Sequence, residues 1–288
     1  MTHSITMERR LWRWLRIVGV AWFSLAILLP VAYVVLVSLT PDTEVGDGSI
    51  LPTHIAWNNY RLMWSTVHLA HDIGNSVVIS GCTGFLATMV ALLASYVLSR
   101  FRFRGRKPFL ISLITMQTIP QVMMLLPLFV ILVIIQNVLR VHLVGQYATI
   151  IVTYLTFALP FACWLLMSYM SSIPIELEEA AQVDGCTRFQ TLTHVVLPLI
   201  LPGMVVTFVF SFLLGWSDVL FASVLTTPST QTVAVGLQSY VATGESGGTV
   251  FWGQLMAASL TSGIPVVIIF LFLQRFIIGG LAHGAVKG

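Results

Sequence analysis

The chain has 288 residues, of which 57% are hydrophobic and 9% are charged, and its mean hydropathy is +0.92. A soluble protein of this length could not bury so much apolar surface. The composition therefore excludes an ordinary soluble globular protein and predicts a single all-α membrane domain.

Six segments are long and apolar enough to cross a bilayer, because a spanning helix needs about 20 mostly apolar residues. Each must be helical, since unpaired backbone polar groups are costly in hydrocarbon. The first is too long for a signal peptide and lacks a small-residue cleavage site, so we expect it to be retained. The expected spans are residues 15–39, 73–98, 109–135, 146–170, 198–221 and 254–278. We interpret the prolines within them as helix kinks: Pro30, Pro120, Pro127, Pro160 and Pro265.

Lys and Arg residues are concentrated on one side of these spans, where 12 of the 14 lie. Because Lys and Arg in short loops favour the cytoplasm, we expect both termini to be cytoplasmic. The same side then holds the N-terminal segment 1–14 and the connection 171–197. The outward segments are 40–72, 136–145 and 222–253.

Several other function classes are excluded. The basic turn at 100–107 has no aromatic stacking platform and no folded basic domain, so we expect no nucleic-acid partner. The three cysteines are too scattered for a disulfide framework, and His68 and His71 lack a third ligand nearby, so we expect no metal site. A phosphate-binding GxxxxGK motif is absent from the sequence, which predicts that any ATP is bound elsewhere. We expect no catalytic residues.

The connection 171–197 is polar and predicts two short helices. Its first residues include a proline and three glutamates, which suit the first turn and the positive end of a helix. Gly185 can adopt the left-handed conformation that ends a helix, and Asp184 tolerates a turn. Thr187 and Gln190 have the spacing of a capping box, so a second helix is expected to run into the fifth span.

Each of these helices is expected to have one apolar side. The residues concerned are Leu177, Ala180 and Ala181 in the first helix and Phe189, Leu192 and Val196 in the second. Helix chemistry leaves two alternatives open. The pair could form a compact knob that docks on a partner, or an interfacial linker that lies flat on lipid headgroups.

A spaced pattern runs through this connection into the fifth span: Glu179-Ala180-Ala181, then Asp184-Gly185, then Leu197-Pro198. It resembles the EAA loop in the membrane subunits of ABC importers, with Val195 where isoleucine is more usual. The resemblance implies that the two helices insert into a cleft of an ATP-binding subunit. It also implies that the glycine allows the turn and that the acidic residue helps to orient the contact, so it favours the docking knob.

Further segments resemble the carbohydrate branch of that family, the smaller permeases of maltose-type importers. They are FRFRGRK at 101–107, IPQVMMLLPLF at 119–129, ALPFACWLL at 158–166, IPIELEEAAQVDG at 173–185 and GAVKG at 284–288. There are two departures: Cys186 stands where alanine is usual, and Ser217 where asparagine is commoner.

The resemblance implies a type I ABC importer permease fold of six transmembrane helices over residues 15–288, in a multi-pass protein of a bacterial plasma membrane. It implies a second homologous permease subunit, two ATP-binding subunits, an extracytoplasmic solute-binding protein, membrane lipid and a sugar as partners, with an oligosaccharide or disaccharide as the expected cargo. The chain is then a non-catalytic transport subunit without a cofactor, because ATP and Mg are bound by partner subunits. The alternatives are a permease for a polyol phosphate or other small solute, an ion-gradient-driven secondary transporter, and a structural membrane adaptor.

Asp218 is the one acidic residue that the sequence places inside or at the edge of a span. An ionisable group there is a functional candidate because its burial is costly. Together with Gln117, Gln121 and Trp216 it forms the candidate translocation path, and one of the two glutamines could pair with its carboxylate. The alternative is that Asp218 lies at the outer surface and caps a helix.

The outward segment 222–253 is rich in Gly, Ser and Thr, which favours a flexible surface loop. In maltose-type relatives the corresponding loop reaches into the solute-binding protein. The resemblance therefore implies a contact with that protein at Gly244, Glu245, Ser246, Gly247 and Gly248.

Overall fold

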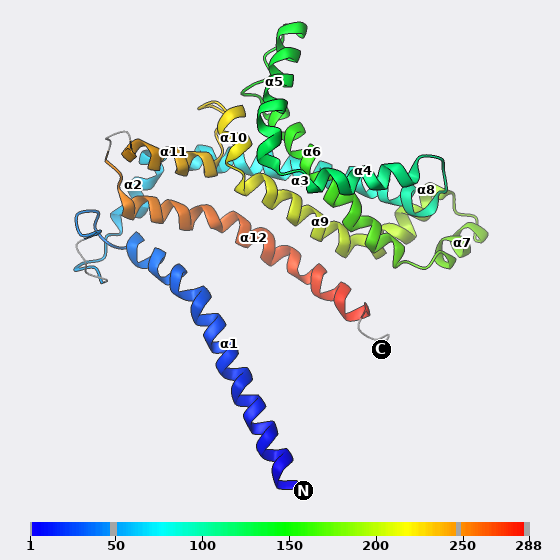
Figure 1. Ribbon diagram of the computed structural model, residues 1–288, viewed down its shortest axis with the longest axis horizontal. Helices are drawn as coiled ribbons and strands as arrows, with labels where there is room; N and C mark the ends of the chain where they lie inside the picture. Colours follow the sequence, from blue (N-terminus) through cyan, green and yellow to red (C-terminus); the bar gives the residue numbers. More distant parts are fainter. Residues whose placement is uncertain (1, 47–50, 246–248, 285–288) are drawn as a thin grey trace. The chain divides into compact units, whose positions relative to one another are not determined.

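The computed structural model describes residues 2–46, 51–245 and 249–284, and every regular element in these ranges is a helix. Figure 1 shows the helices, coloured along the chain from blue at the N-terminus to red at the C-terminus. The chain forms two compact units, one of residues 1–68 and 240–261 and the other of residues 69–239 and 262–288. The described residues confirm the expected all-α fold.

Within the described ranges, six helical stretches are long and apolar enough to span a bilayer, as the sequence predicts. They are Trp12–Ser38, Leu69–Arg100, Gln121–Leu139, Tyr147–Ser171, Arg188–Ser217 and Trp252–Phe276. The first lies within α1 (Thr2–Ser38) and the last within α12 (Trp252–Gly284). Most of the expected N-terminal segment 1–14 therefore continues the first spanning helix.

The third span differs from its predicted range, 109–135. The structure divides this range into α4 (Arg106–Thr118) and α5 (Gln121–Leu139). Pro120 is responsible, because a proline disfavours the helical conformation of the residue before it, and Ile119 is extended, with φ −80° and ψ 122°. Pro120 thus separates two helices instead of kinking one. The four other predicted prolines do lie inside helices: Pro30, Pro127, Pro160 and Pro265.

In the unit that contains α1, the helix α2 (Asn58–Thr66) joins the end of α1 to the start of α12. Asn59 is buried and donates from Nδ2 to the backbone oxygen of Ser38 at 3.0 Å. Thr66 donates from its hydroxyl to Oε1 of Gln254 at 2.7 Å. The outward segment between the first two spans therefore contains a helix with fixed polar contacts.

In the other unit, α3 (Leu69–Arg100) is the central helix and packs against α6 (Tyr147–Ser171) and α9 (Leu197–Ser217) (Figure 1). Ala87 and Ala91 of α3 are fully buried in this core. Small side chains allow membrane helices to approach closely, which explains their place at the centre of the bundle.

The start of α3 corrects one expectation from the sequence. The helix begins at Leu69, earlier than the predicted residue 73, and this brings Asp72 into its first turn. Asp72 is buried there. Asp218 is therefore not the only acidic residue at the edge of a span, and the carboxylate of Asp72 suits the positive end of the helix.

The outward segment 222–253 is also corrected, because it is not simply a flexible loop. It contains most of α10 (Leu220–Leu225) and all of α11 (Val233–Glu245). The fifth span accordingly ends at Ser217, before the predicted residue 221, since Asp218 is extended, with ψ 131°.

Side chains of α3 hold the chain between α10 and α11. Asn75 donates from Nδ2 to the backbone oxygen of Gln231 at 2.8 Å, and the amide of Val233 donates to Oγ of Ser76 at 2.8 Å. Tyr147 of α6 donates from its hydroxyl to Oδ1 of Asn75 at 2.6 Å. In a flexible loop the backbone polar groups of Gln231 and Val233 would bind water, but here they are paired with buried side chains.

Candidate functional site

The first helix of the connection 171–197, hereafter the coupling loop, is α7 (Glu176–Val183), and it ends in a left-handed turn as predicted. Gly185 has φ +93°, a conformation that side chains with a Cβ rarely adopt. The amide of Cys186 donates to the oxygen of Ala181 at 2.9 Å, and the amide of Gly185 donates to that of Gln182 at 3.1 Å. These two bonds form a Schellman motif, which stops the helix and reverses the chain.

The second helix begins with the predicted capping box. The amide of Gln190 donates to Oγ1 of Thr187 at 3.3 Å, and the amide of Thr187 donates to Oε1 of Gln190 at 2.8 Å. α8 (Arg188–Thr191) then passes through a π-helical turn, η1 (Leu192–Val196), into α9. The second helix is therefore continuous with the fifth span.

The π turn was not predicted from the sequence. Leu197 and Pro198 form the start of α9 directly after it. Pro198 lacks the amide hydrogen that would continue the α-helical pattern, and such interruptions are accommodated by a widened turn. Leu192 and Val196, the first and last residues of this turn, are buried, but Phe189 is 74% exposed. The expectation that all three share one side of the helix is therefore wrong for Phe189.

Most of the predicted coupling residues are accessible. Glu179, Ala180, Asp184 and Gly185 are exposed, while Ala181 is buried against the rest of the unit. The apolar side predicted for α7 is thus divided, because Leu177 and Ala180 are exposed and Ala181 is buried. Val183, at the end of α7, is 88% exposed.

One residue of the coupling loop was missed as a contact. Glu178 is buried and accepts from Nε of Arg100, at the end of α3, at 2.6 Å. The hydroxyl of Tyr96 donates to its other oxygen at 3.3 Å, and Nη2 of Arg100 donates to the backbone oxygen of Ile173 at 2.9 Å. The three-residue spacing between Glu178 and Ala181 is the signal that could have placed this glutamate on the inner side of α7.

The second helix also contacts the residue that directly follows α3. The guanidinium of Arg188 lies over the ring of Phe101, 5.1 Å from its centre, in a cation–π contact. Both helices of the coupling loop therefore contact the same end of α3, and Figure 1 shows α7 and α8 together at that end of the bundle.

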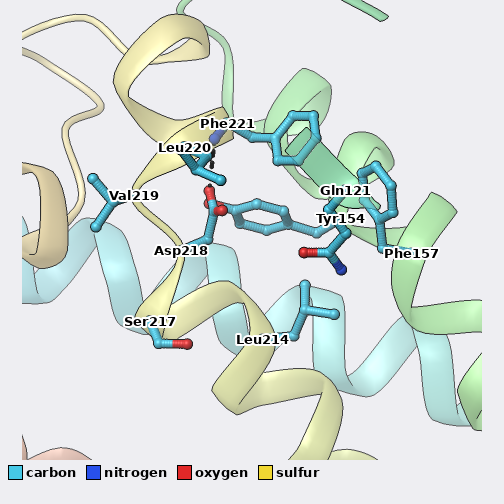
Figure 2. Close-up of a pocket in the computed structure, with 9 residues that line it drawn as sticks. All are labelled: Gln121, Tyr154, Phe157, Leu214, Ser217, Asp218, Val219, Leu220 and Phe221. Atoms are coloured by element: carbon cyan, nitrogen blue, oxygen red, sulfur yellow. Dashed lines mark hydrogen bonds between the residues drawn. The ribbon is translucent and has the colours of Figure 1, made fainter. Parts of the chain in front are cut away.

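Asp218 lies at the opposite end of α9, beside a cavity of about 380 Å³ (Figure 2). Its Oδ2 accepts from the hydroxyl of Tyr154 at 2.9 Å and from the amides of Phe221 and Ala222 at 3.1 and 3.0 Å. The hydrogen bonds from these two amides cap the start of α10. The geometry matches the alternative in which Asp218 caps a helix, and its partner is Tyr154 in place of a glutamine.

The predicted glutamines nevertheless lie near Asp218. Gln121 lines the same cavity, and Figure 2 shows its amide near the ring of Tyr154. A second cavity of about 700 Å³, mostly apolar, includes Gln117 and shares Gln121, Phe157, Leu214 and Ser217 with the first. Trp216 is buried and stacked on Phe212, with ring centres 5.4 Å apart, and lines neither cavity.

The predicted contact with a solute-binding protein lies only partly within the described residues. Gly244 and Glu245 form the end of α11, whereas Ser246, Gly247 and Gly248 lie outside the described residues. In the part of the chain that the structure describes, no three His, Cys, Asp or Glu side chains are grouped as metal ligands would be.

Comparisons with known proteins agree with one another. The family profile described as "Binding-protein-dependent transport system inner membrane component" matches residues 83–282. The trehalose/maltose transport system permease protein MalG of Thermococcus litoralis is 31% identical, over 98% of this chain and 99% of that protein. The diacetylchitobiose uptake system permease protein DasC of Streptomyces coelicolor is 30% identical, over 96% of this chain and 97% of that protein.

Solved structures show the same fold. A chain from the crystal structure of a bacterial ABC transporter involved in the import of the acidic polysaccharide alginate superposes with a TM-score of 0.74. The match covers 92% of this chain and 96% of the other, at 21% identity.

Proposed function

Because the chain belongs to the family of binding-protein-dependent transport system inner membrane components, and has the six-helix type I ABC importer permease fold, we propose that it is a permease subunit of an ATP-driven sugar importer. An oligosaccharide or disaccharide is the proposed cargo. Relatives that match nearly the whole chain are named for trehalose, maltose and diacetylchitobiose, which supports this class of substrate.

The observation that carries the proposal is the exposed turn between α7 and α8. The Schellman motif at Gly185 and the capping box at Thr187 make this turn rigid without help from a partner. Its outer surface offers Glu179, Ala180 and Val183. A rigid, exposed helix pair suits insertion into a cleft of an ATP-binding subunit, which binds ATP and Mg in place of this chain.

The movement that follows is alternating access. When ATP closes the two ATP-binding subunits, they displace the coupling loop. α8, η1 and α9 form one continuous helical path, so displacement of the loop moves the fifth span directly. This chain and a second, homologous permease then rock about a cavity between them, and the sugar passes from an extracytoplasmic binding protein to the cytoplasm.

The sugar path in this chain is proposed to include the two cavities beside Asp218. They combine a carboxylate and two amides, from Asp218, Gln117 and Gln121, with the aromatic ring of Phe157. Sugars present hydroxyl groups at their edges and apolar faces to aromatic rings, so such a mixed lining suits them. Trp216 is stacked on Phe212, and neither residue lines these cavities, so we do not include Trp216 in the proposed path.

The orientation follows from charge. The side with 12 of the 14 Lys and Arg residues, including the coupling loop and both termini, is proposed to face the cytoplasm of a bacterial cell. The outward segment 222–253, with Gly244 to Gly248, then faces the solute-binding protein.

Transport by the complete importer in proteoliposomes tests this function. We expect accumulation of radiolabelled trehalose or maltose when ATP is enclosed with the ATP-binding subunits and the solute-binding protein is supplied on the other side. An ionophore that collapses ion gradients should leave the rate unchanged. Uptake that survives without ATP but stops with the ionophore would contradict the proposal and favour a secondary transporter.

A further inference from the structure

The contact between Arg100 and Glu178 is unusual because both charges are almost completely removed from solvent. Their side chains are 11% and 4% exposed. A buried ion pair is tolerated only where further hydrogen bonds satisfy the remaining polar atoms. The hydroxyl of Tyr96 and the backbone oxygen of Ile173 meet this requirement. The pair is therefore a completed polar cluster with a fixed geometry.

We propose that Arg100 and Glu178 are positioning residues that fasten the coupling loop to α3, so that movement of α7 is passed to the centre of the bundle as well as to α9. This inference rests on the proposed function of the coupling loop. It adds a second route for the movement, through a helix that is distant from the loop in sequence.

The position of α3 explains why a side-chain link is needed. α9 follows the coupling loop directly in the chain, but Arg100 precedes Glu178 by 78 residues. Arg100 fixes α7 at two points, since it donates to Glu178 within the helix and to Ile173 just before it. A forked guanidinium that holds two groups at once resists both sliding and rotation of α7 against α3.

The contacts at the opposite end of α3 indicate that the outward segment would receive the movement. α3 has 32 residues, which corresponds to a length of about 48 Å. At its far end Asn75 and Ser76 hold the backbone at Gln231 and Val233. One helix thus contacts the coupling loop at one end and the outward segment at the other.

The neighbouring acidic residues offer a matched control. Glu176 and Glu179 also lie in the first turn of α7, but both are exposed. Replacing Glu176 removes a charge from the same turn without touching α3. We therefore compare Glu178→Gln with Glu176→Gln in the complete importer, and Arg100→Lys with Arg102→Lys, because Arg102 is exposed in the adjoining basic turn.

The measured quantity is the amount of radiolabelled maltose or trehalose imported per ATP hydrolysed in proteoliposomes. Glu178→Gln should lower this ratio about tenfold while ATP hydrolysis continues, which is within the usual range of coupling between sites. Arg100→Lys retains the positive charge but loses the forked guanidinium, and should lower the amount of sugar imported per ATP about threefold. Both control variants should keep the wild-type ratio.

A distance measurement separates transmission from a general loss of structure. With the natural cysteines replaced, spin labels at Val183 of α7 and Val97 of α3 occupy exposed positions. The distance between them should be the same with and without ATP in the wild type, and should change on ATP binding in Glu178→Gln.

Each result decides between the two claims. A wild-type ratio in both Glu178→Gln and Arg100→Lys would overturn the positioning role and leave the proposed function intact. If Glu178→Gln fails to assemble, the ratio in Arg100→Lys decides alone. Absence of ATP-driven sugar import by the wild-type importer would instead overturn the proposed function.

Discussion

The coupling loop and the outward segment 222–253 both connect spans and both contain short helices, yet they are ordered in different ways. The coupling loop caps its own helices, with Gly185 ending α7 and Thr187 starting α8. The outward segment depends on Asn75 and Ser76, which lie about 150 residues earlier in the chain. The coupling loop can keep its shape while it is displaced, whereas the outward segment also needs α3 to hold the chain between α10 and α11.

The largest effect on sugar uptake is expected at the turn of the coupling loop. Gly185→Val forces a β-branched residue into φ +93°, at a cost of about 1–2 kcal/mol. We expect sugar uptake to fall roughly tenfold or more while ATP hydrolysis continues. Gly105→Val is the control, because Gly105 has φ +100° outside the coupling loop and an added Cβ would meet nothing within 4 Å in either case. Equal loss of coupling in both variants would contradict a special role for the loop.

The next effect is expected at the anchor of the outward segment. Asn75→Ala leaves the backbone oxygen of Gln231 and the hydroxyl of Tyr147 without their buried partner, which costs about 1–3 kcal/mol. Hydrogen exchange at residues 226–239 should become faster, and exchange in the coupling loop should stay unchanged. Ser223→Ala, which removes an exposed hydroxyl from α10, should alter neither. Faster exchange in both regions would show that they are not independently ordered.

A smaller effect is expected at Asp218, where a loss of sugar uptake can be separated from a loss of stability. Asp218→Asn keeps an oxygen that accepts from the amides of Phe221 and Ala222, whereas Asp218→Ala removes the cap, at a cost of about 1 kcal/mol. We expect both variants to weaken sugar uptake several-fold, and only Asp218→Ala to lower the thermal stability of the complex. Wild-type uptake by Asp218→Asn would restrict Asp218 to the capping role.

The smallest effect is expected for the capping box. Thr187→Ala removes the side-chain acceptor for the amide of Gln190, at a cost of about 1 kcal/mol. Uptake should fall by less than about fivefold, since the Schellman motif at Gly185 remains. Thr193→Ala, which removes a hydroxyl bonded to Phe189, should have no effect on uptake. A loss as large as that of Gly185→Val would mean that the two caps act as a unit.

The same contrast explains what the sequence could predict. The spans, the turn at Gly185 and the capping box at Thr187 depend on local composition and on residues three or four positions apart, and all were found. The helices of the outward segment were missed, because some of the side chains that order it, Asn75 and Ser76, belong to α3. The break at Pro120 was misjudged for a different reason: we expected this proline to kink one helix, but it holds Ile119 in an extended conformation and separates two.

The candidate site shows the same difference between local patterns and contacts that are distant in the sequence. Glu179, Asp184 and Gly185 were chosen from a spaced pattern and prove to be exposed, as docking residues must be. Glu178 looked like one of three equivalent glutamates until the structure placed Arg100 beside it. The sequence offered Gln117 or Gln121 as a possible partner of Asp218, since nothing in it relates Tyr154 to the end of the fifth span.

The most direct test of the account is a photo-crosslinking amino acid at Val183, the highly exposed residue at the end of α7, in the importer within native membranes. Illumination should join this chain to an ATP-binding subunit, identified by mass spectrometry, and the same group at Ser223 should not. Crosslinking of Val183 to lipid alone would contradict the account and favour a linker that lies flat on the headgroups.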